Sequence, residues 1–346
     1  MALFYPLAIL ISASLITLSS ISMHLFIMQL VWVGVGVGLI FLFFFFDWRI
    51  ILNYRWLIGG FYLVVLILLV AVYSSPVVRN VRSWVFLGPF SFQPVELAKV
   101  ALILVYASYF SRRHLSIARW KNILTSFIFF LIPAVLTALQ PDFGSALVLF
   151  GIWFGFLVLS GLPLKRTLIT VLIFALAGVF IWFNVFKDYQ RARVRAIFYP
   201  ERNTLGVNYS VVQSKIAIGS SGFWGKGYGQ GSQVQLGFLT EPATDFIFSA
   251  FIEEWGVFGG MVVIFSFLAL IFQILKVGAR KSGNFEKFIC LGTATVLGLQ
   301  FIFNVGSQLG LTPVIGITYP FFSYGGSSLT ANFLLLAIVN AISREQ

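Results

Sequence analysis

Long stretches without a single charged residue constrain this chain more than any other feature of its sequence. Residues 1–46 contain no Lys, Arg, Asp or Glu, and neither do residues 288–343. A helix that crosses a bilayer needs about 20 mostly apolar residues, so each stretch has room for two crossings. Inside lipid only helices and closed barrels satisfy the backbone, and these apolar runs are continuous rather than alternating. We therefore predict membrane-spanning helices.

Shorter apolar segments fill much of the remaining chain and bring the number of predicted spans to ten. They are 56–78, 94–111, 122–141, 143–164, 167–186 and 255–275. Charged residues make up only 10% of the 346 residues, and the mean hydropathy is +0.96, which is far from the averages of soluble proteins. We expect an all-α polytopic membrane protein with ten transmembrane helices, forming a single domain over residues 1–346.

The distribution of Lys and Arg predicts how these helices are oriented. Cations in short loops mark the cytoplasmic side of a membrane protein. With ten spans the loops form two alternating sets, and the short loops of one set contain only Arg79 and Arg82. The other set carries Arg49, Arg55, Arg112, Arg113, Arg119, Lys121, Lys165, Arg166, Lys276, Arg280, Lys281, Lys287 and Arg344. We therefore expect both termini in the cytoplasm.

A large external loop, residues 187–245, is expected between the seventh and eighth helices. Its cations do not contradict the orientation, because long loops cross regardless of charge; they are Lys187, Arg191, Arg193, Arg195, Arg202, Lys215 and Lys226. They favour an anionic partner at the outer surface. The loop begins with a basic segment whose Val194, Ile197 and Phe198 have near-helical spacing, which predicts an interfacial helix. The Gly-rich stretch 219–237 is either a flexible loop or a phosphate cradle.

Acidic residues are rare, and four of the eleven fall in residues 239–256, LTEPATDFIFSAFIEEWG. Asp245 is either a first-turn acid that interacts with the helix dipole, with Thr244 as the N-cap, or a functional carboxylate that faces a cavity. We favour the functional interpretation. We expect Glu253 or Glu254 to pair with a cation or a backbone group, and both to hold this helix in the bundle.

Other polar positions lie close to the predicted membrane helices. Glu96 and Lys99 share one helix face, which predicts a mutual salt bridge, a charged pair beside a substrate or proton path, or both. Asp142 in LQPDFG is expected to be a helix N-cap. Trp84 is either an interfacial anchor or a surface on which a sugar stacks. A single Cys and two His argue against a metal site built from these residues.

Several motifs together resemble the SEDS family (shape, elongation, division and sporulation), whose best-known members are RodA and FtsW. Residues 304–328, NVGSQLGLTPVIGITYPFFSYGGSS, resemble the signature of that family. Two further segments of the family are resembled by SFQPVELAK and LQPDFGSAL. The large external loop resembles its RodA form, through QSKIAIGSSGFWGKG followed by LTEPATDFIF. The matches run from about residue 82 to residue 330 in the expected order.

The resemblance implies a peptidoglycan glycosyltransferase that polymerises lipid II at the outer face of the bacterial cytoplasmic membrane during cell elongation. Its implied partners are a class B penicillin-binding protein, lipid II and membrane lipids, and no nucleic acid. Asp245 matches the essential aspartate of the family. The candidate substrate-binding residues are those in the matching motifs together with external cations: Arg82, Trp84, Glu96, Lys99, Arg191, Arg193, Arg195, Gln213, Lys215, Ser323, Gly325 and Gly326. No tightly bound cofactor is expected; a divalent cation, Mg²⁺ or Mn²⁺, remains open, with its ligands unknown.

This chain departs from the family pattern at several positions. Ala243 stands where His is usual, Ser91 where Arg is common, Val95 where Ser is usual and Thr318 where Pro is usual. If the missing His or Arg binds substrate in relatives, another group must do so here, and Arg82 is the substitute we consider.

Our mechanistic hypothesis makes Asp245 the general base that takes a proton from a sugar hydroxyl. Two alternatives remain from the sequence. A flippase or transporter for the lipid-linked precursor also fits charges inside the membrane and broken helices. A scaffold that recruits a penicillin-binding protein is the third interpretation.

Overall fold

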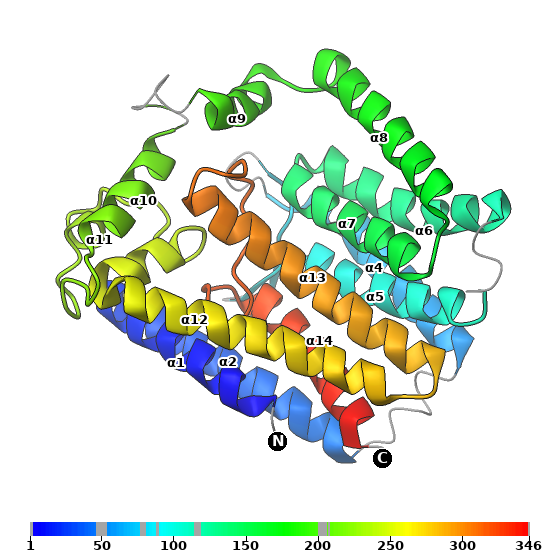
Figure 1. Cartoon of the computed structure of the whole chain (residues 1–346), viewed down its shortest axis with the longest axis horizontal. Coiled ribbons are helices and arrows are strands. Elements are labelled where there is room, and N and C mark those ends of the chain that lie inside the picture. The colour runs from blue at the N-terminus through cyan, green and yellow to red at the C-terminus, as the bar shows by residue number, and fades with distance from the viewer. Residues whose placement is uncertain are drawn as a thin grey trace.

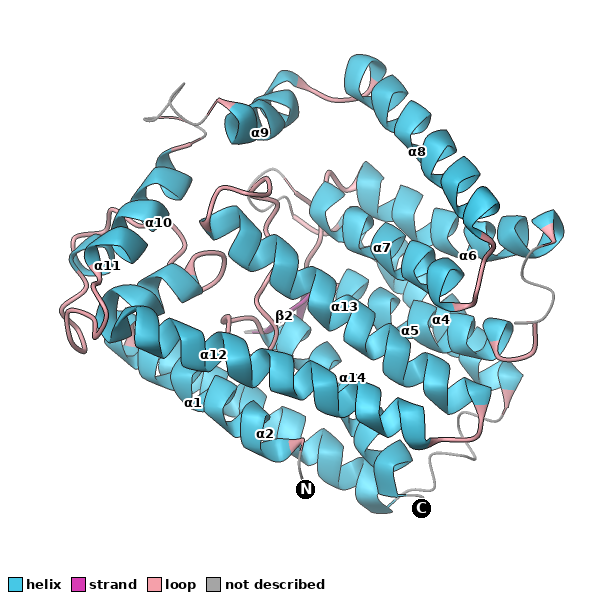
Figure 2. Cartoon of the chain, in the orientation of Figure 1, coloured by secondary structure: helices cyan, strands magenta, loops and turns pink. Residues whose placement is uncertain are grey.

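The computed structural model describes residues 3–45, 54–76, 81–87, 90–113, 119–199, 206 and 208–344 as a bundle of long helices. Figure 1 shows both chain termini at the same end of the bundle, and Figure 2 shows how little of the described chain is strand. The long helices are α1 (Phe4–Ile21), α2 (Met23–Phe45), α4 (Arg55–Ala71), α5 (Pro94–Phe110), α6 (Trp120–Leu139), α7 (Phe143–Leu159), α8 (Leu164–Asn184), α12 (Ile247–Arg280), α13 (Asn284–Gln308) and α14 (Gly326–Arg344).

The helices confirm an all-α multi-pass membrane protein. Eight of those that the structure describes are long and apolar enough to cross a membrane. Helix α7 is apolar but has only 17 residues, and α5 also has 17. Each predicted span coincides with a helix, in the predicted order, but the number of ten crossings stays a prediction.

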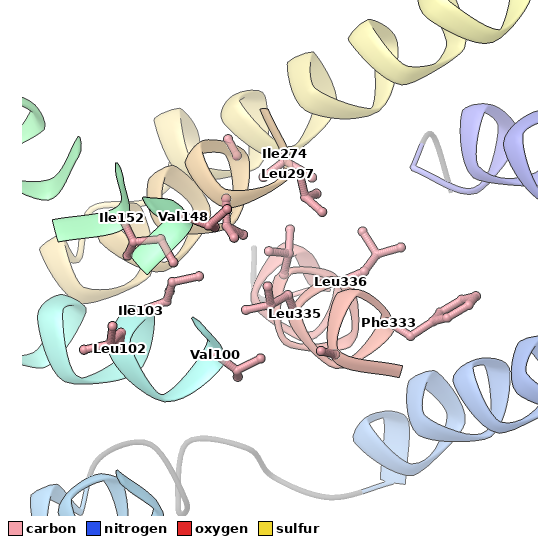
Figure 3. Packing of buried hydrophobic residues seen from close by; sticks show 14 of the residues in the cluster. Val100, Leu102, Ile103, Val148, Ile152, Ile274, Leu297, Phe333, Leu335 and Leu336 are labelled. Carbon is pink, nitrogen blue, oxygen red and sulfur yellow. The ribbon is translucent and has the colours of Figure 1, made fainter. Parts of the chain in front are cut away.

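Helix α5 lies at the centre of the bundle, where it contacts α4, α7, α13 and α14. Val100, Leu102 and Ile103 of this helix are fully buried. Figure 3 shows them opposite apolar side chains of α7 and α14. Because α5 is surrounded by other helices, any polar side chain that it carries must be satisfied inside the protein. Its charged pair is therefore an interior feature.

Helix α8 lies at the edge of the bundle (Figure 1), and most of its residues are not buried. Its Phe174 ring packs against Phe127 of α6 and against Phe150 and Trp153 of α7. The chain then enters α9 (Asp188–Phe198), so the predicted basic helix in the external loop is confirmed. The loop also contains α10 (Tyr209–Ser220) and a single turn, α11 (Ser232–Gln235).

Helix α12 is interrupted at Gly256, whose backbone is non-helical with φ 71° and ψ −178°. The Gly-rich loop fills this break with its own backbone. The N–H groups of Lys226 and Gly227 donate to the Glu253 and Glu254 carbonyls at 3.0 Å, and those of Val257 and Phe258 donate to the Gly222 and Phe223 carbonyls at 3.1 Å. The loop replaces hydrogen bonds that a continuous helix would make with itself.

The predicted cytoplasmic cations can be compared with the helix ends. Arg55 begins α4, Arg112 follows α5, Lys165 lies in the first turn of α8 and Arg280 ends α12. These helix ends lie at the end of the bundle that holds both termini (Figure 1). The clustering agrees with the predicted orientation, which remains a prediction. Arg49, Arg79 and Arg202 lie outside the described residues.

Candidate functional site

The turn that carries Asp245 is held through three successive main-chain carbonyls. The Ala243 carbonyl accepts the Tyr324 N–H at 2.9 Å, and the Thr244 carbonyl accepts the Ser323 hydroxyl at 2.6 Å. The Asp245 carbonyl accepts Nδ2 of Asn304 at 3.2 Å. Because these contacts use the backbone, they fix the position of Asp245 without engaging its carboxylate.

The predicted N-cap at Thr244 is wrong. Helix α12 begins at Ile247, its N-cap residue is Phe246, and no side chain caps it. Thr244 instead donates its N–H to the Glu241 carbonyl at 3.2 Å and its hydroxyl to the Glu241 carboxylate at 3.3 Å. Asp245 therefore precedes the helix, in a turn whose geometry depends on contacts with α13 and the chain before α14.

A buried polar network lies behind this turn. Gln308 of α13 accepts hydrogen bonds at Oε1 from the Ser249 N–H and hydroxyl, both at 2.8 Å, and its Nε2 donates to Asn304 Oδ1 at 2.7 Å. The Ser214 hydroxyl, from α10, donates to the Gln308 carbonyl at 2.8 Å. The network therefore joins α10, α12 and α13. Sequence reasoning missed Gln308; the available signal was an amide side chain within the long uncharged run of residues 288–343.

Residues 309–325, which we call the connecting segment, join α13 to α14 and bring several predicted residues together. A Cβ atom placed on Gly316 would lie 4.0 Å from Asp245 Oδ2, and one on Gly310 would lie 2.7 Å from Lys215 Nζ. The Arg193 guanidinium donates to the Val314 carbonyl at 3.3 Å. The connecting segment thus lies close to the Asp245 carboxylate at Gly316. It also lies close to two cations of the external loop, Lys215 and Arg193. The connecting segment consists of turns and irregular backbone and contains no helix.

The other two predicted cations of α9 interact with the end of α8. Arg191 donates from Nε to the Trp182 carbonyl and from an Nη to the Phe183 carbonyl, both at 3.0 Å. Cations are favourable at a helix C-terminus because they satisfy its unpaired carbonyls and oppose the dipole. The Arg195 guanidinium lies 6.0 Å from the Trp182 ring centroid. These contacts fasten α9 to α8, and a role in substrate binding for either residue stays a prediction.

Glu96 and Lys99 form the predicted salt bridge. Lys99 Nζ lies 2.8 and 2.9 Å from the two carboxylate oxygens of Glu96, and only 8% of the Glu96 side chain and 5% of the Lys99 side chain are exposed. A buried pair of this kind needs its partner, because removing one charge leaves the other uncompensated. Whether the pair also lies beside a substrate path stays a prediction.

Asp142 is confirmed as the N-cap of α7. Its carboxylate accepts the Ser145 N–H at 3.0 Å and the Ser145 hydroxyl at 2.8 Å. It also accepts Nε2 of Gln93 at 3.1 Å, and the Gln93 N–H donates to Ser327 Oγ at 3.0 Å. The cap therefore links the beginnings of α5, α7 and α14, at the end of the bundle that carries Asp245.

Replacing Asp142 by Ala is expected to lower the free energy of unfolding by about 1–2 kcal/mol, because it removes the cap and leaves the Gln93 amide without this acceptor. Thermal unfolding in detergent measures the change. Asp142→Asn keeps an oxygen at the same place and is the matched control, for which we expect a smaller loss. Equal losses in the two variants would contradict the capping role.

Arg82 and Trp84 lie in the chain that precedes a short hairpin, β1 (Val85–Leu87) and β2 (Phe90–Phe92), which the sequence did not predict. The exposed Arg82 donates its N–H to the Gln140 carbonyl and an Nη to the Tyr73 carbonyl, both at 3.4 Å. Trp84 is partly exposed. Ser91 lies in β2 and its carbonyl accepts the Ser327 hydroxyl at 3.5 Å. The substitution of Arg82 for the missing arginine stays a prediction.

Four further predicted site residues lie in α10 and around the beginning of α14. Gln213 is a partly exposed residue of α10. The buried Ser323 hydroxyl is engaged on both sides, since it accepts the Tyr319 N–H at 2.9 Å and donates to Thr244. A Cβ atom on Gly326 would overlap the Trp32 ring, whereas Gly325 has no such conflict. Ser323 and Gly326 thus have structural contacts, and substrate contacts by these four residues stay predictions.

Glu253 and Glu254 hold the Gly-rich loop, and the predicted pairing with a cation is confirmed for Glu253. Its fully buried carboxylate lies 2.6 Å from Lys226 Nζ and accepts the Gln233 N–H at 3.0 Å. Glu254 accepts the Ser20 hydroxyl at 2.5 Å and the Gly229 N–H at 3.2 Å, which joins the loop to α1. Both acids are structural, as expected.

Metal ligands are sparse around Asp245. Within the residues that the structure describes, there is no group of three or more His, Cys, Asp or Glu side chains that could hold a metal ion. Mg²⁺ is often bound by one or two carboxylates together with water and substrate phosphates. A cation at Asp245 would therefore take most of its ligands from water or from substrate phosphates.

Comparison with known proteins gives one consistent result. The family model FtsW/RodA/SpoVE, described as cell cycle protein, matches residues 1–346. Peptidoglycan glycosyltransferase MrdB of Escherichia coli K12 is 36% identical over 282 residues, covering 81% of this chain and 76% of MrdB. Stage V sporulation protein E of Bacillus subtilis is 32% identical over 286 residues, covering 82% and 76%.

Solved structures that resemble this chain come from proteins of the same kind. A chain from a peptidoglycan synthase complex that coordinates polymerization and crosslinking superimposes with a TM-score of 0.86, at 32% identity, over 99% of this chain and 97% of that one. The rod shape determining protein RodA of Thermus thermophilus superimposes with a TM-score of 0.74, at 28% identity, over 99% and 96%.

Proposed function

This chain belongs to the FtsW/RodA/SpoVE family and is a peptidoglycan glycosyltransferase of the SEDS type, and we propose that it polymerises lipid II with Asp245 as the general base. The observation that carries the proposal is the placement of Asp245. Three main-chain hydrogen bonds hold its turn, while its partly exposed side chain lies next to Gly316 of the connecting segment. A base must be held in place without losing access to substrate.

The proposed reaction forms one glycosidic bond and breaks the C–O bond that joins a sugar to its pyrophosphate leaving group. The 4-hydroxyl of a terminal GlcNAc attacks C1 of MurNAc on a second molecule, and its proton passes to the Asp245 carboxylate. The bond between C1 and the undecaprenyl pyrophosphate oxygen breaks, and its electron pair leaves with the pyrophosphate. Attack opposite an α-linked leaving group produces a β-1,4 linkage, so the step inverts the configuration at C1.

The second requirement of this reaction is that the negative charge on the pyrophosphate leaving group is neutralised. Nearby cations support the proposal. Lys215 and Arg193 lie at the connecting segment, on the same stretch of chain as Gly316. Fixed positive groups stabilise negative charge that develops on a leaving group. A divalent cation, Mg²⁺ or Mn²⁺, would neutralise the same charge when bound, and we propose that pyrophosphate oxygens supply most of its ligands.

We propose that Asp245 faces the outer side of the bacterial cytoplasmic membrane and that both termini are cytoplasmic. The cations at the helix ends near the termini support this orientation, because such residues concentrate on the cytoplasmic side. We further propose a class B penicillin-binding protein as partner. This rests on the likeness to a chain from a complex that coordinates polymerization and crosslinking.

Polymerisation by the purified protein tests the function. Incubation with fluorescent lipid II is expected to give long glycan strands that a muramidase digests, as resolved by gel electrophoresis. A transport function predicts a different result, namely passage of the lipid II headgroup across sealed vesicles without polymer, and the buried Glu96–Lys99 pair is the feature that favours it. Headgroup passage without any polymer would overturn the proposal.

A further inference from the structure

A cavity of about 340 Å³ lies at the end of the bundle opposite Asp245, between α4, α5 and α6. Its volume is within the range of ordinary ligand pockets. Three arginines line it: Arg55 at the beginning of α4, and Arg112 and Arg113 directly after α5. Among the described residues that line the cavity, none is acidic. The pocket therefore brings three guanidinium groups together at this end of the bundle.

The rest of the lining is apolar or aromatic. Ile58, Val105 and Phe129 contribute side chains to the wall, and Tyr109 stacks under Arg113, whose guanidinium carbon lies 4.4 Å from the ring centroid. A guanidinium group over an aromatic ring is attracted to the ring face, which helps to hold the arginine side chain in place. Guanidinium groups above an apolar wall suit a ligand with a charged head and a hydrocarbon tail.

The position of the pocket along the helices matches the headgroup layer of a membrane. Tyr54 and Trp56 flank Arg55 at the beginning of α4, and Trp56 is 71% exposed. Exposed Trp and Tyr at the end of an apolar helix are typical of the membrane–water interface.

We propose that this pocket binds the phosphate headgroup of an anionic phospholipid, with the acyl chains lying along the apolar wall. Basic pockets between membrane helices recognise such headgroups through charge and hydrogen bonds to phosphate. The same guanidinium groups could hold a free phosphate, but the apolar wall and the interfacial aromatic residues favour a lipid. The proposal is independent of the polymerase chemistry, since it uses none of the residues around Asp245.

Lipid titration followed by native mass spectrometry tests the proposal. The purified protein is titrated with dioleoyl phosphatidylglycerol and, separately, with dioleoyl phosphatidylcholine, which has the same chains and no net charge. We expect preferential retention of phosphatidylglycerol. The double variant Arg55→Gln, Arg112→Gln should weaken its binding by about tenfold or more, because it removes two of the three cations that line the pocket.

Two controls separate the pocket from general surface charge. The double variant Lys276→Gln, Arg280→Gln removes equal charge at the same end of the bundle, from α12, and should keep the binding. Gly59→Leu keeps every charge but fills the pocket, since a Cβ at Gly59 meets no atom within 4 Å, and should abolish the preference.

Three outcomes would overturn the proposal. In the first, the α12 variant loses as much binding as the pocket variant, which would show diffuse attraction only. In the second, Gly59→Leu retains full binding. In the third, inorganic phosphate or glycerol phosphate at millimolar concentration displaces phosphatidylglycerol, which would assign the pocket to a soluble anion.

Discussion

Replacing Asp245 by Asn is expected to reduce lipid II polymerisation by about 10²- to 10⁴-fold, the usual contribution of a general base. The amide has nearly the same shape as the carboxylate but cannot take the proton of the attacking hydroxyl. The contacts that hold the turn go to the main-chain carbonyls of Ala243, Thr244 and Asp245, so they persist in the variant. The rate of strand formation from labelled lipid II measures the effect.

Glu241→Gln provides the matched control for this experiment. Glu241 is a second partly exposed acid of the same turn, and its side-chain oxygen accepts the Thr244 hydroxyl, which a glutamine oxygen can also do. We expect it to polymerise lipid II at close to the unmodified rate. Both variants should unfold within about 0.5 kcal/mol of the parent protein, because both side chains are partly exposed and both substitutions nearly preserve their shape. Normal polymerisation by Asp245→Asn would eliminate the general-base role.

Replacing Gly256 by Ala is expected to lower the free energy of unfolding by about 3 kcal/mol or more. Its φ of 71° and ψ of −178° lie in a region that is essentially restricted to glycine, and occupation by another residue costs on the order of 1–3 kcal/mol. A Cβ atom would also overlap the Phe223 carbonyl and the Gly225 N–H, which are main-chain atoms that cannot rotate away. Thermal unfolding in detergent provides the measurement.

Gly298→Ala is the control for the effect of adding a methyl group to a membrane helix. Gly298 lies inside α13 with helical geometry, and a Cβ there meets no atom within 4 Å. Alanine has the higher helix propensity, so we expect no loss or a gain of up to about 1 kcal/mol. If the two alanine variants unfolded at the same temperature, the packing of the Gly-rich loop against Gly256 would contribute nothing to stability.

The features that could be predicted from the sequence depend on interactions between near neighbours. The cap at Asp142 requires only the following turn of helix, and the pair of Glu96 and Lys99 requires only one helix face. The helix over residues 188–198 follows from the spacing of its apolar residues. The membrane helices themselves follow from unbroken apolar runs, because the requirement to satisfy the backbone in lipid leaves few alternatives.

The features that escaped prediction depend on contacts between distant parts of the chain. Thr244 has a suitable side chain for an N-cap, but contacts from α13 and the connecting segment hold the turn in another geometry. The role of Gln308 depends on Ser249, 59 residues away in sequence. To predict that Gly256 packs against the loop, one must know where residues 222–227 contact α12. No local pattern encodes these encounters.

The manner in which the turn at residues 243–245 is held has a consequence for how this site can evolve. Its neighbours bind three carbonyl oxygens, and every amino acid has a carbonyl oxygen. The placement of Asp245, the proposed general base, is therefore separated from the identity of the residues beside it. Ala243 replaces the histidine usual in this family without removing any of those hydrogen bonds. Substitutions beside Asp245 can thus change the side chains around the carboxylate without removing the contacts that hold it in position.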